Sequence, residues 1–507
     1  MHSAYTTVMF YHIGKLIALC LCLVAIVADS VELRLDEEQI FLRADQESLL
    51  DVLSDFVRIG VDVRVEPGID AIVSGSLEGS PIDVGLDTLL KSFNYVLFWE
   101  RLPGPAGNLT RLSGIHVFHP GRQNAVVPFI PNGENFVVVR KPGIPPHTKD
   151  EILLGLKPGT TIKQFRELLA SIGGTVISSL SSLGVYHVGL PRETDVPSLV
   201  RSLLGNPWVA VAEPNYVQQV PQPVHSPGIG RGVGSNSDVR IPKKPAPPAA
   251  GSATVAVFDS GLTNLDQLNE VIAGTYDSVQ PGRAMSDPLG HGTQMALVAS
   301  GAILPGGAEA DTARDATPVL AIRSFDDNGR ASNFSLLRAI DYTVEQGGRV
   351  ISMSWGTEIH SEFLEHAIRY AHENGIILVA SAGNEPHGRP VYPAAYDPVL
   401  PISAMLPDGS IWPSSNYGPI IFAAAPGTGD FPIGYNGPPG GYVGTSIASP
   451  FVGRVLSQYL DQHPNSSVKE TISALQSSLS DAGQVGRDAR YGYGALDDAA
   501  IRRFLSK

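Results

Sequence analysis

A serine near the C-terminal end of the chain lies where a loop turns into a helical pattern. Ser446 follows Gly444 and Thr445, and apolar residues continue after it at the spacing of one helical face. A serine in this place can be an ordinary helix cap, because its hydroxyl accepts a bond from a free N–H group. The same place also holds a hydroxyl on rigid backbone beside N–H groups that can bind developing negative charge. Ser446 is therefore a candidate nucleophile, with the cap as the alternative.

Three other polar residues stand at the ends of apolar runs or at helix starts in the same part of the chain. Asp259 closes the run VAVFD, His291 opens the pattern HGTQMALVASG, and Asn384 follows the run ILVAS. Each one alone fits a structural role as a turn residue or a cap. Together with Ser446 they supply a carboxylate, an imidazole, an amide donor and a hydroxyl, which are the groups that acyl transfer uses.

Residues 252–507 resemble the subtilisin-like serine proteases in the blocks VAVFDSG, HGTQMALVASG, SWG, ASAGNEP and GTSIASPFVG, and in the order of these blocks. The resemblance implies that Ser446 is the nucleophile, that His291 is the general base and that Asp259 orients the imidazole. It also implies that Asn384 stabilises the oxyanion together with the serine N–H group.

The substrate site that the resemblance implies is the stretch Ser354, Trp355 and Gly356. In the family this stretch lines the first pocket and pairs with the substrate backbone. Trp355 is bulky where the family usually has a smaller apolar residue, and Val391 would narrow the pocket floor. We therefore expect small or medium apolar side chains before the cleaved bond.

The sequence departs from the family pattern beside the histidine. Gln294 stands where many members have a second histidine, which is outside the triad. The loop AILPGGAEADTARDAT replaces a loop that binds calcium in many members. Asp311 and Asp315 in this loop could bind an ion, but solvated surface is the simpler interpretation. We predict no metal and no other cofactor, with calcium as the alternative.

Continuous apolar runs predict the sheet that must position these residues, because parallel strands buried on both faces need such runs. The runs cover residues 255–258, 319–322, 350–353 and 376–379. Helical patterns over 292–301, 334–346 and 361–374 separate them. The pattern predicts an α/β fold over 252–507, which the resemblance makes a subtilisin-like three-layer domain with a mostly parallel sheet. Active sites in such sheets lie at the carboxyl ends of the strands.

Residues 149–217 show the order β-α-β-β-α-β, which predicts a ferredoxin-like α+β sandwich. Helices are expected over 161–172 and 196–204. The segment also resembles the inhibitory propeptide of subtilisin-like proteases, in LKPGT, GGTV and the ending NPWVAVAEPNYV. The resemblance implies that this prodomain is an intramolecular inhibitor. Residues 218–251, which are rich in proline and glycine, are expected to form a linker in which the chain is cut.

Residues 31–120 are expected to form a small N-terminal α/β domain, with helices over 47–59 and 84–93. The pattern, with VDVRVEPGI, SGSLEG and YVLFWER, resembles the short N-terminal domain of secretins and TonB-dependent receptors. The resemblance implies a module that binds an envelope protein in bacteria, and the alternative is a small domain of unknown role. Residues 121–148, rich in proline and glycine, are interpreted as a linker.

The chain has 507 residues, with 36 Lys and Arg against 50 Asp and Glu, a net charge of −14. This charge argues against non-specific binding to nucleic acid. Residues 1–28 fit a signal peptide with an apolar run over 16–28, and a retained membrane anchor is the alternative. The two cysteines, Cys20 and Cys22, lie in this run, so a cleaved chain would use neither disulfide nor thiol chemistry. We expect an exported bacterial protein, periplasmic or secreted, without stable membrane insertion after cleavage.

The sequence thus predicts an exported serine endopeptidase that is made as a zymogen and acts on proteins or peptides. One alternative is an envelope binding or signalling protein whose first domain is the working part and whose protease domain has a regulatory role. Another alternative is an inactive relative of the proteases. The four intact candidates Asp259, His291, Asn384 and Ser446 argue against the last one.

Overall fold

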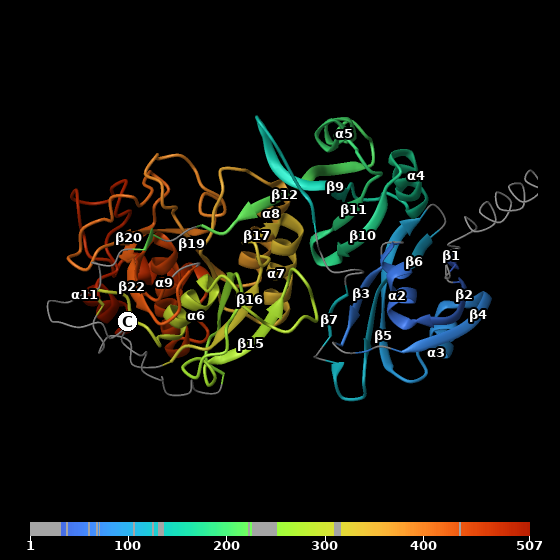
Figure 1. The fold of residues 1–507 in the computed structure, drawn as a ribbon, viewed down its shortest axis with the longest axis horizontal. Helices are drawn as coiled ribbons and strands as arrows, with labels where there is room; N and C mark the ends of the chain where they lie inside the picture. Colours follow the sequence, from blue (N-terminus) through green and yellow to red (C-terminus); the bar gives the residue numbers. More distant parts are fainter. Residues whose placement is uncertain are drawn as a thin grey trace, which may run out of the picture.

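A computed structural model describes residues 32–36, 39–58, 61–66, 69, 71–104, 107–123, 126–129, 136–221, 224–225, 251–308, 316–435 and 438–507. Figure 1 shows three units, which we call the first unit (32–129), the middle unit (136–221) and the large unit (251–507). The predicted signal peptide, most of the predicted linker after residue 221, and Asp311 and Asp315 lie outside the described residues. In the part of the chain that is described, no helix is long and apolar enough to span a membrane.

The large unit is built on a sheet of seven parallel strands in the order β15-β16-β14-β18-β19-β20-β21. These strands are β14 (Val255–Asp259), β15 (Ile272–Asp277), β16 (Val319–Arg323), β18 (Val350–Met353), β19 (Ile377–Ser381), β20 (Leu400–Met405) and β21 (Ala423–Pro426). Every residue of β14, β16, β18 and β19 is buried, so both faces of the sheet are covered. The predicted α/β fold with a parallel sheet is confirmed.

Two helices of the large unit begin with candidate site residues, and they pack against each other. They are α6 (His291–Ser300) and α9 (Thr445–Gln462). A second packed pair is α7 (Asn333–Glu345) and α8 (Glu362–Glu373). The remaining elements are β17 (Arg330–Ser332), β22 (Thr428–Phe431), β23 (Gly440–Val443), α10 (Val468–Gln476) and α11 (Asp498–Leu505).

The middle unit has the strand order β10-β11-β9-β12, which is the order of a ferredoxin-like sandwich. Its elements are β8 (Val138–Lys141), β9 (Ile144–Leu156), α4 (Ile162–Ile172), β10 (Thr175–Leu180), η2 (Ser181–Leu183), β11 (Val185–Gly189), α5 (Val196–Leu203) and β12 (Val209–Gln219). Thr161 forms a capping box at the start of α4, and Gly173 ends the helix with a positive φ of 62°. The predicted β-α-β-β-α-β order is therefore observed.

The structure differs from the sequence prediction over 121–148, where we expected a linker. Residues 138–141 and 144–148 instead pair as the antiparallel strands β8 and β9. Gly143 makes the turn between them with a φ of 75°. The prolines in this segment suggested a linker, but they lie on an edge pairing, where a missing N–H group is tolerated.

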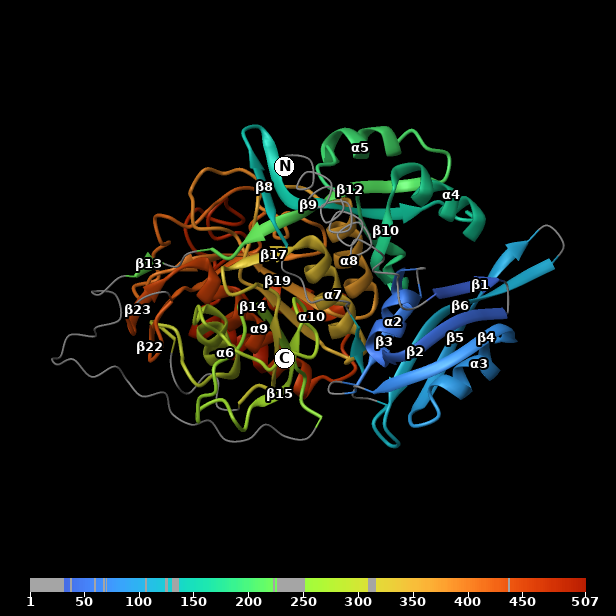
Figure 2. The same ribbon diagram turned by 45° about the vertical axis from the view of Figure 1, so that its right-hand side comes forward.

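The first unit contains two small sheets, in the orders β1-β2-β4 and β5-β6-β3-β7. Its elements are β1 (Glu32–Asp36), β2 (Gln39–Ser48), α2 (Leu49–Arg58), β3 (Asp62–Val65), β4 (Ile72–Pro81), α3 (Ile82–Leu89), β5 (Asn94–Gly104), β6 (Gly107–Phe118) and β7 (Val127–Pro128). Helix α2 lies within the predicted segment 47–59. Helix α3 begins two residues before the predicted segment 84–93 and ends four residues before the end of that segment. The unit has its own apolar core, and Figure 2 shows it beside both the middle and the large unit.

Candidate active site

A buried carboxylate and a buried imidazole meet at the carboxyl end of β14. Asp259 is the last residue of β14 and His291 is the first residue of α6. Asp259 Oδ1 lies 2.7 Å from His291 Nδ1, and the same oxygen accepts a bond from the Ser260 N–H group at 2.7 Å. Both side chains are almost fully buried. His291 Nε2 has no hydrogen-bond partner among the described residues, so this nitrogen is left for another group.

The start of α6 is held by two residues that the sequence analysis missed. Asp287 accepts bonds from the N–H groups of Gly290 at 2.9 Å and Thr293 at 2.7 Å. Ser260 Oγ accepts from the Gly292 N–H at 2.9 Å and itself donates to Asp287. These bonds fix the helix from which the imidazole projects. An aspartate shortly before a helix was the available signal, but three residues separate Asp287 from His291, so it does not stand at the usual cap position.

Ser446 is the second residue of α9, and it is not the cap of that helix. The cap is Gly444, which has no side chain to make a capping bond. The alternative that Ser446 is an ordinary cap is therefore wrong. The N–H group of the second residue of a helix has no acceptor within that helix. The Ser446 hydroxyl lies 3.4 Å from the Ser354 carbonyl oxygen, and Ser354 Oγ donates to the Ser446 carbonyl at 2.9 Å.

Asn384 lies beside the same helix start, three residues after β19 ends. Its Oδ1 accepts bonds from the N–H and the hydroxyl of Thr445, at 3.0 and 2.7 Å. Its Nδ2 is buried and has no partner in the described part of the chain. A methyl group placed on Gly444 would lie 3.4 Å from this nitrogen. An unpaired buried donor is costly, so its presence beside the serine helix calls for a ligand.

Tyr435 covers the imidazole from the side. Its ring packs edge to face on His291, with the ring centres 5.2 Å apart. Burial, together with the charges of Asp259 and Asp287, raises the pKa of Tyr435 to about 12. The phenol therefore stays neutral at physiological pH and shields the pair from solvent without adding a charge.

The three residues expected to bind substrate lie in different environments. Ser354 contacts Ser446, as described above. The side chain of Trp355 is fully buried and packs edge to face on Phe325 at 6.0 Å, so it belongs to the core of the large unit. Gly356 lies directly against Val391, because a methyl group on this glycine would come within 2.4 Å of Val391 Cγ1. Val391 thus borders the stretch that was expected to bind the substrate backbone.

No group of three or more His, Cys, Asp or Glu side chains that could hold a metal ion occurs within the described ranges. Gln294, the residue that replaces a second histidine, is buried and donates to the Ile433 carbonyl at 2.8 Å. Its role in this structure is to tie α6 to the loop before β23.

Comparison with known protein families agrees with this geometry. Residues 251–494 match the subtilase family, and residues 136–215 match the N-terminal prodomain of fervidolysin. Residues 251–494 form a subtilase domain. The middle unit is a prodomain like that of fervidolysin, and the match begins in the segment that the sequence analysis interpreted as a linker.

Individual subtilases are similar to this chain over different lengths. The thermophilic serine proteinase of Bacillus sp. (strain AK1) is 28% identical over 348 residues, which cover 66% of this chain and 84% of that protein. The minor extracellular protease Epr of Bacillus subtilis (strain 168) is 31% identical over 243 residues, 48% of this chain and 37% of that protein. This chain thus spans little more than a third of the second relative.

A solved structure shows the same fold. It is the crystal structure of fervidolysin from Fervidobacterium pennivorans, a keratinolytic enzyme related to subtilisin, with a TM-score of 0.56 at 22% identity. The match covers 73% of this chain and 63% of that chain. The predicted subtilisin-like fold is confirmed, and in this chain the subtilase domain follows a fervidolysin-like prodomain.

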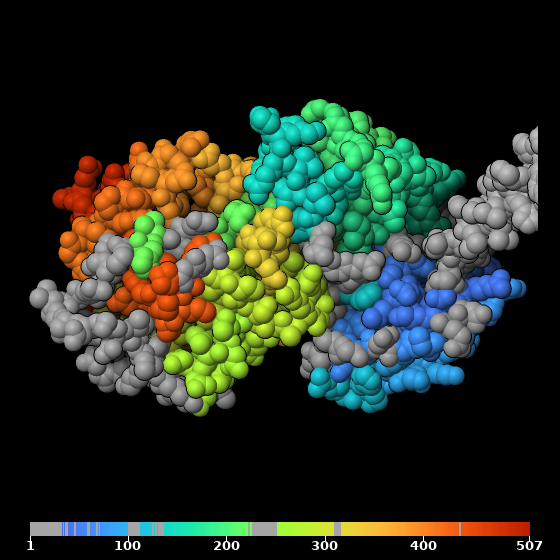
Figure 3. Space-filling model, viewed as in Figure 1, coloured from blue at the N-terminus to red at the C-terminus, as the bar shows by residue number. Residues whose placement is uncertain are grey.

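The end of the prodomain and the residues after it pair with two strands of the subtilase domain. Strand β12 pairs antiparallel with β17, with Val217 opposite Ser332, and the Val220 N–H donates to the Gly329 carbonyl at 2.9 Å. Farther along, β13 (Val224–His225) pairs with β23, which leads directly into the start of α9. Figure 3 shows this short green segment on the orange surface of the subtilase domain. The chain is therefore paired on both sides of residues 222–223.

The prodomain also caps two helices of the subtilase domain. Asn215 Oδ1 accepts a bond from the Phe334 N–H at 3.0 Å, at the start of α7. Glu213 accepts bonds from the Ser361 hydroxyl and from the Glu362 N–H, the latter at 3.2 Å, at the start of α8. Burial raises the pKa of Glu213 to about 7, although these hydrogen bonds oppose the shift.

Proposed function

We propose that this chain is a serine endopeptidase whose nucleophile is Ser446 and whose general base is His291. The observation that carries the proposal is a pair of unused buried nitrogens. Among the described residues His291 Nε2 has no partner while Nδ1 binds Asp259, and Asn384 Nδ2 has none beside the start of the serine helix. A base needs a free nitrogen to take a proton, and an oxyanion site needs a free donor.

The reaction follows from these groups. His291 Nε2 takes the proton of the Ser446 hydroxyl as Oγ attacks the scissile carbonyl, and Asp259 steadies the imidazolium that forms. Asn384 Nδ2 and the Ser446 N–H bind the oxyanion. The imidazolium then gives its proton to the leaving amine, and an acyl-enzyme remains on Ser446. Water, activated by the same imidazole, releases the acid and restores the hydroxyl.

We infer that the chain is a zymogen that is cut between Val220 and Val224. The prodomain tail pairs antiparallel with β17, and main-chain pairing of this kind is how an extended peptide binds to a strand. Gln218 is almost fully buried there and donates to Asn333 Oδ1 at 2.9 Å. On this hypothesis, the tail blocks the cleft until the chain is cut. The backbone of a protein or peptide substrate is then expected to bind along Ser354, Trp355 and Gly356. The buried side chain of Trp355 would hold this stretch in place from the core.

The proposal extends to an exported protein whose first unit can bind another envelope protein, in a periplasmic or secreted setting. The extracellular relative supports export. The first unit keeps several large apolar side chains exposed, which offers apolar area to a partner. These side chains are Ile72, Val84, Val96, Phe98 and Trp99. This second role leaves the proteolytic role of the large unit unchanged.

The proteolytic proposal is tested by comparing the full chain with its Ser446→Ala variant. We expect the wild type to shorten by about the length of its first two units and to react with a fluorophosphonate probe. The variant should do neither. Labelling that persists in the variant would show that another residue is the nucleophile. Unlabelled and uncut wild type would favour an inactive relative of the proteases.

A further inference from the structure

We propose that the first unit is a clasp that keeps the prodomain bound to the subtilase domain after the chain between them is cut. This inference rests on the proposed zymogen function and adds a regulatory role for the first unit. A cut between Val220 and Val224 leaves the first unit and the prodomain on one fragment. The subtilase domain is the other fragment. Every contact between the first unit and the subtilase domain then resists separation of the two.

The contact centres on Arg64, which projects from β3 of the first unit and is almost fully buried. Its guanidinium forms an ion pair with Glu345, and Nη2 lies 3.3 Å from Asp341 Oδ2. Both carboxylates belong to α7 of the subtilase domain. Nε lies 3.2 Å from Asp62 of the first unit. One cation therefore joins carboxylates of two units that a cut would separate.

Asp341 also receives a bond from the prodomain. Ser182 Oγ donates to Asp341 Oδ1, while Arg64 uses the other oxygen. The carboxylate of Asp341 is almost fully buried. The first unit, the prodomain and the subtilase domain thus meet at a single side chain. The first unit and the prodomain are also joined directly, because α2 packs on β10 and Arg166 donates to the Leu35 carbonyl at 3.1 Å.

The charges at this junction make Arg64 indispensable to it. Burial raises the pKa of Asp62 and of Glu345, and the positive charge of Arg64 counteracts that rise. Without the guanidinium, Asp62, Asp341 and Glu345 would lose the cation that pairs with all three of them. Truncating one partner of a buried charge pair mainly accelerates dissociation, since the remaining charges stay unpaired.

The fragment would hold α7 at both ends. Asn215 of the prodomain caps its first turn, and Arg64 of the first unit binds its last residue, Glu345. A cation at the carboxyl end of a helix is favourable, as is a cap at the amino end. Two linked contacts bind more tightly than either alone, because the second one forms at a high effective concentration. The first unit therefore makes the prodomain a slower inhibitor to release.

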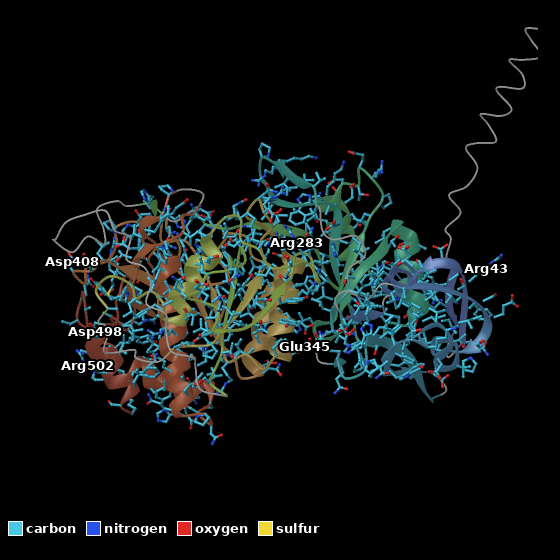
Figure 4. The ribbon with its side chains drawn as sticks, turned by 60° about the horizontal axis from the view of Figure 1, so that its bottom comes forward. Arg43, Arg283, Glu345, Asp408, Asp498 and Arg502 are labelled. Carbon is cyan, nitrogen blue, oxygen red and sulfur yellow. The ribbon has the colours of Figure 1, made fainter. Side chains whose placement is uncertain are left out.

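The test uses the full chain with Ser446→Ala and a recognition sequence for a site-specific protease placed within residues 226–250. After cleavage by the added protease, the rate of fragment separation is measured by size-exclusion chromatography or by immobilising the subtilase domain. We expect Arg64→Met to raise the dissociation rate at least tenfold. Arg43→Met is the matched control, because Arg43 is exposed on β2, and Figure 4 shows it far from Glu345.

A second variant guards against local unfolding of the first unit. Glu345→Gln changes only the subtilase domain and should also raise the dissociation rate. The double variant should add little to Arg64→Met alone, since both remove the same pair. Equal dissociation rates for Arg64→Met, Arg43→Met and the parent would overturn the clasp. Because this assay needs no proteolytic activity, failure of fluorophosphonate labelling in the wild type would count against the proposed function alone.

Discussion

The two helices that carry His291 and Ser446 differ in how many of their early N–H groups are bound by side chains. At the start of α6, Asp287 and Ser260 accept the early N–H groups, and the imidazole stands on a closed, fixed turn. At the start of α9, Gly444 is the cap, and the side-chain bond that the described residues show to an early N–H group is the one from Thr445 to Asn384 Oδ1. A base needs a fixed direction, whereas a helix that is to bind developing negative charge must keep N–H groups available. A helix start can thus fix a side chain when its N–H groups are bound, or bind negative charge when they are left available.

The starts of α7 and α8 form a third group. Each has its own serine cap, Ser332 or Ser361, and each receives a further bond from the prodomain. These two ends are complete only while the prodomain is bound. The comparison therefore separates a helix end that the subtilase domain satisfies by itself, one that it leaves open, and two that it shares with its inhibitor.

The open end of α9 gives the largest expected effect. Asn384→Ala removes the free Nδ2 donor and should lower kcat of the processed enzyme by about 10²–10³. Thr445→Val is the control, because it removes only the hydroxyl that donates to Asn384 Oδ1. We expect this control to change kcat much less. An equal loss in both variants would mean that Asn384 acts by holding the helix rather than by donating to the oxyanion.

The closed end of α6 should instead contribute mainly to stability. Asp287→Ala leaves buried N–H groups of Gly290 and Thr293 without an acceptor, which should lower the free energy of unfolding by about 1–3 kcal/mol. Urea unfolding of the Ser446→Ala chain, which cannot digest itself, measures this change. Asp266→Ala is the control, because Asp266 also precedes α6 in the chain but its side chain is exposed. Equal stability of the two variants would contradict the role of Asp287.

The sequence was informative where the signal is local. The apolar runs of β14 and β19 predict buried strands, and the glycine before Ser446 predicts a helix start. The sequence was uninformative where bonded residues lie far apart along the chain. Ser260 and Gly292, for example, meet only because the end of β14 lies beside the start of α6. Strand β8 and residues 144–148 of β9 were missed because prolines in this segment look like a linker.

The side chain of Trp355 teaches a related lesson. Its place in a substrate-binding stretch suggested a residue that lines a pocket, yet the indole is fully buried against Phe325. Alternation along an extended stretch turns successive side chains to opposite sides. A sequence block therefore identifies the backbone of a site more reliably than the direction of each side chain.

The helix ends shared with the prodomain give the smallest expected effect, and it depends on pH. Burial raises the pKa of Glu213 from its ordinary value of 4.5 to about 7 in the complex, so protonation strengthens binding. The stabilisation is complete below about pH 4.5 and is lost as the pH rises through about 7. We expect the cut prodomain to dissociate about tenfold faster at pH 8 than at pH 5.

This pH effect can be separated from the titration of the catalytic groups. Samples incubated at each pH are diluted to one common pH before the peptidase assay, so that only the released fraction differs. Glu213→Gln keeps an acceptor for the Glu362 N–H but cannot ionise. It should remove most of the difference between pH 5 and pH 8. If the variant keeps the full pH dependence, another group at the interface controls release of the prodomain. The bonds from Glu213 to the start of α8 would then not regulate this release.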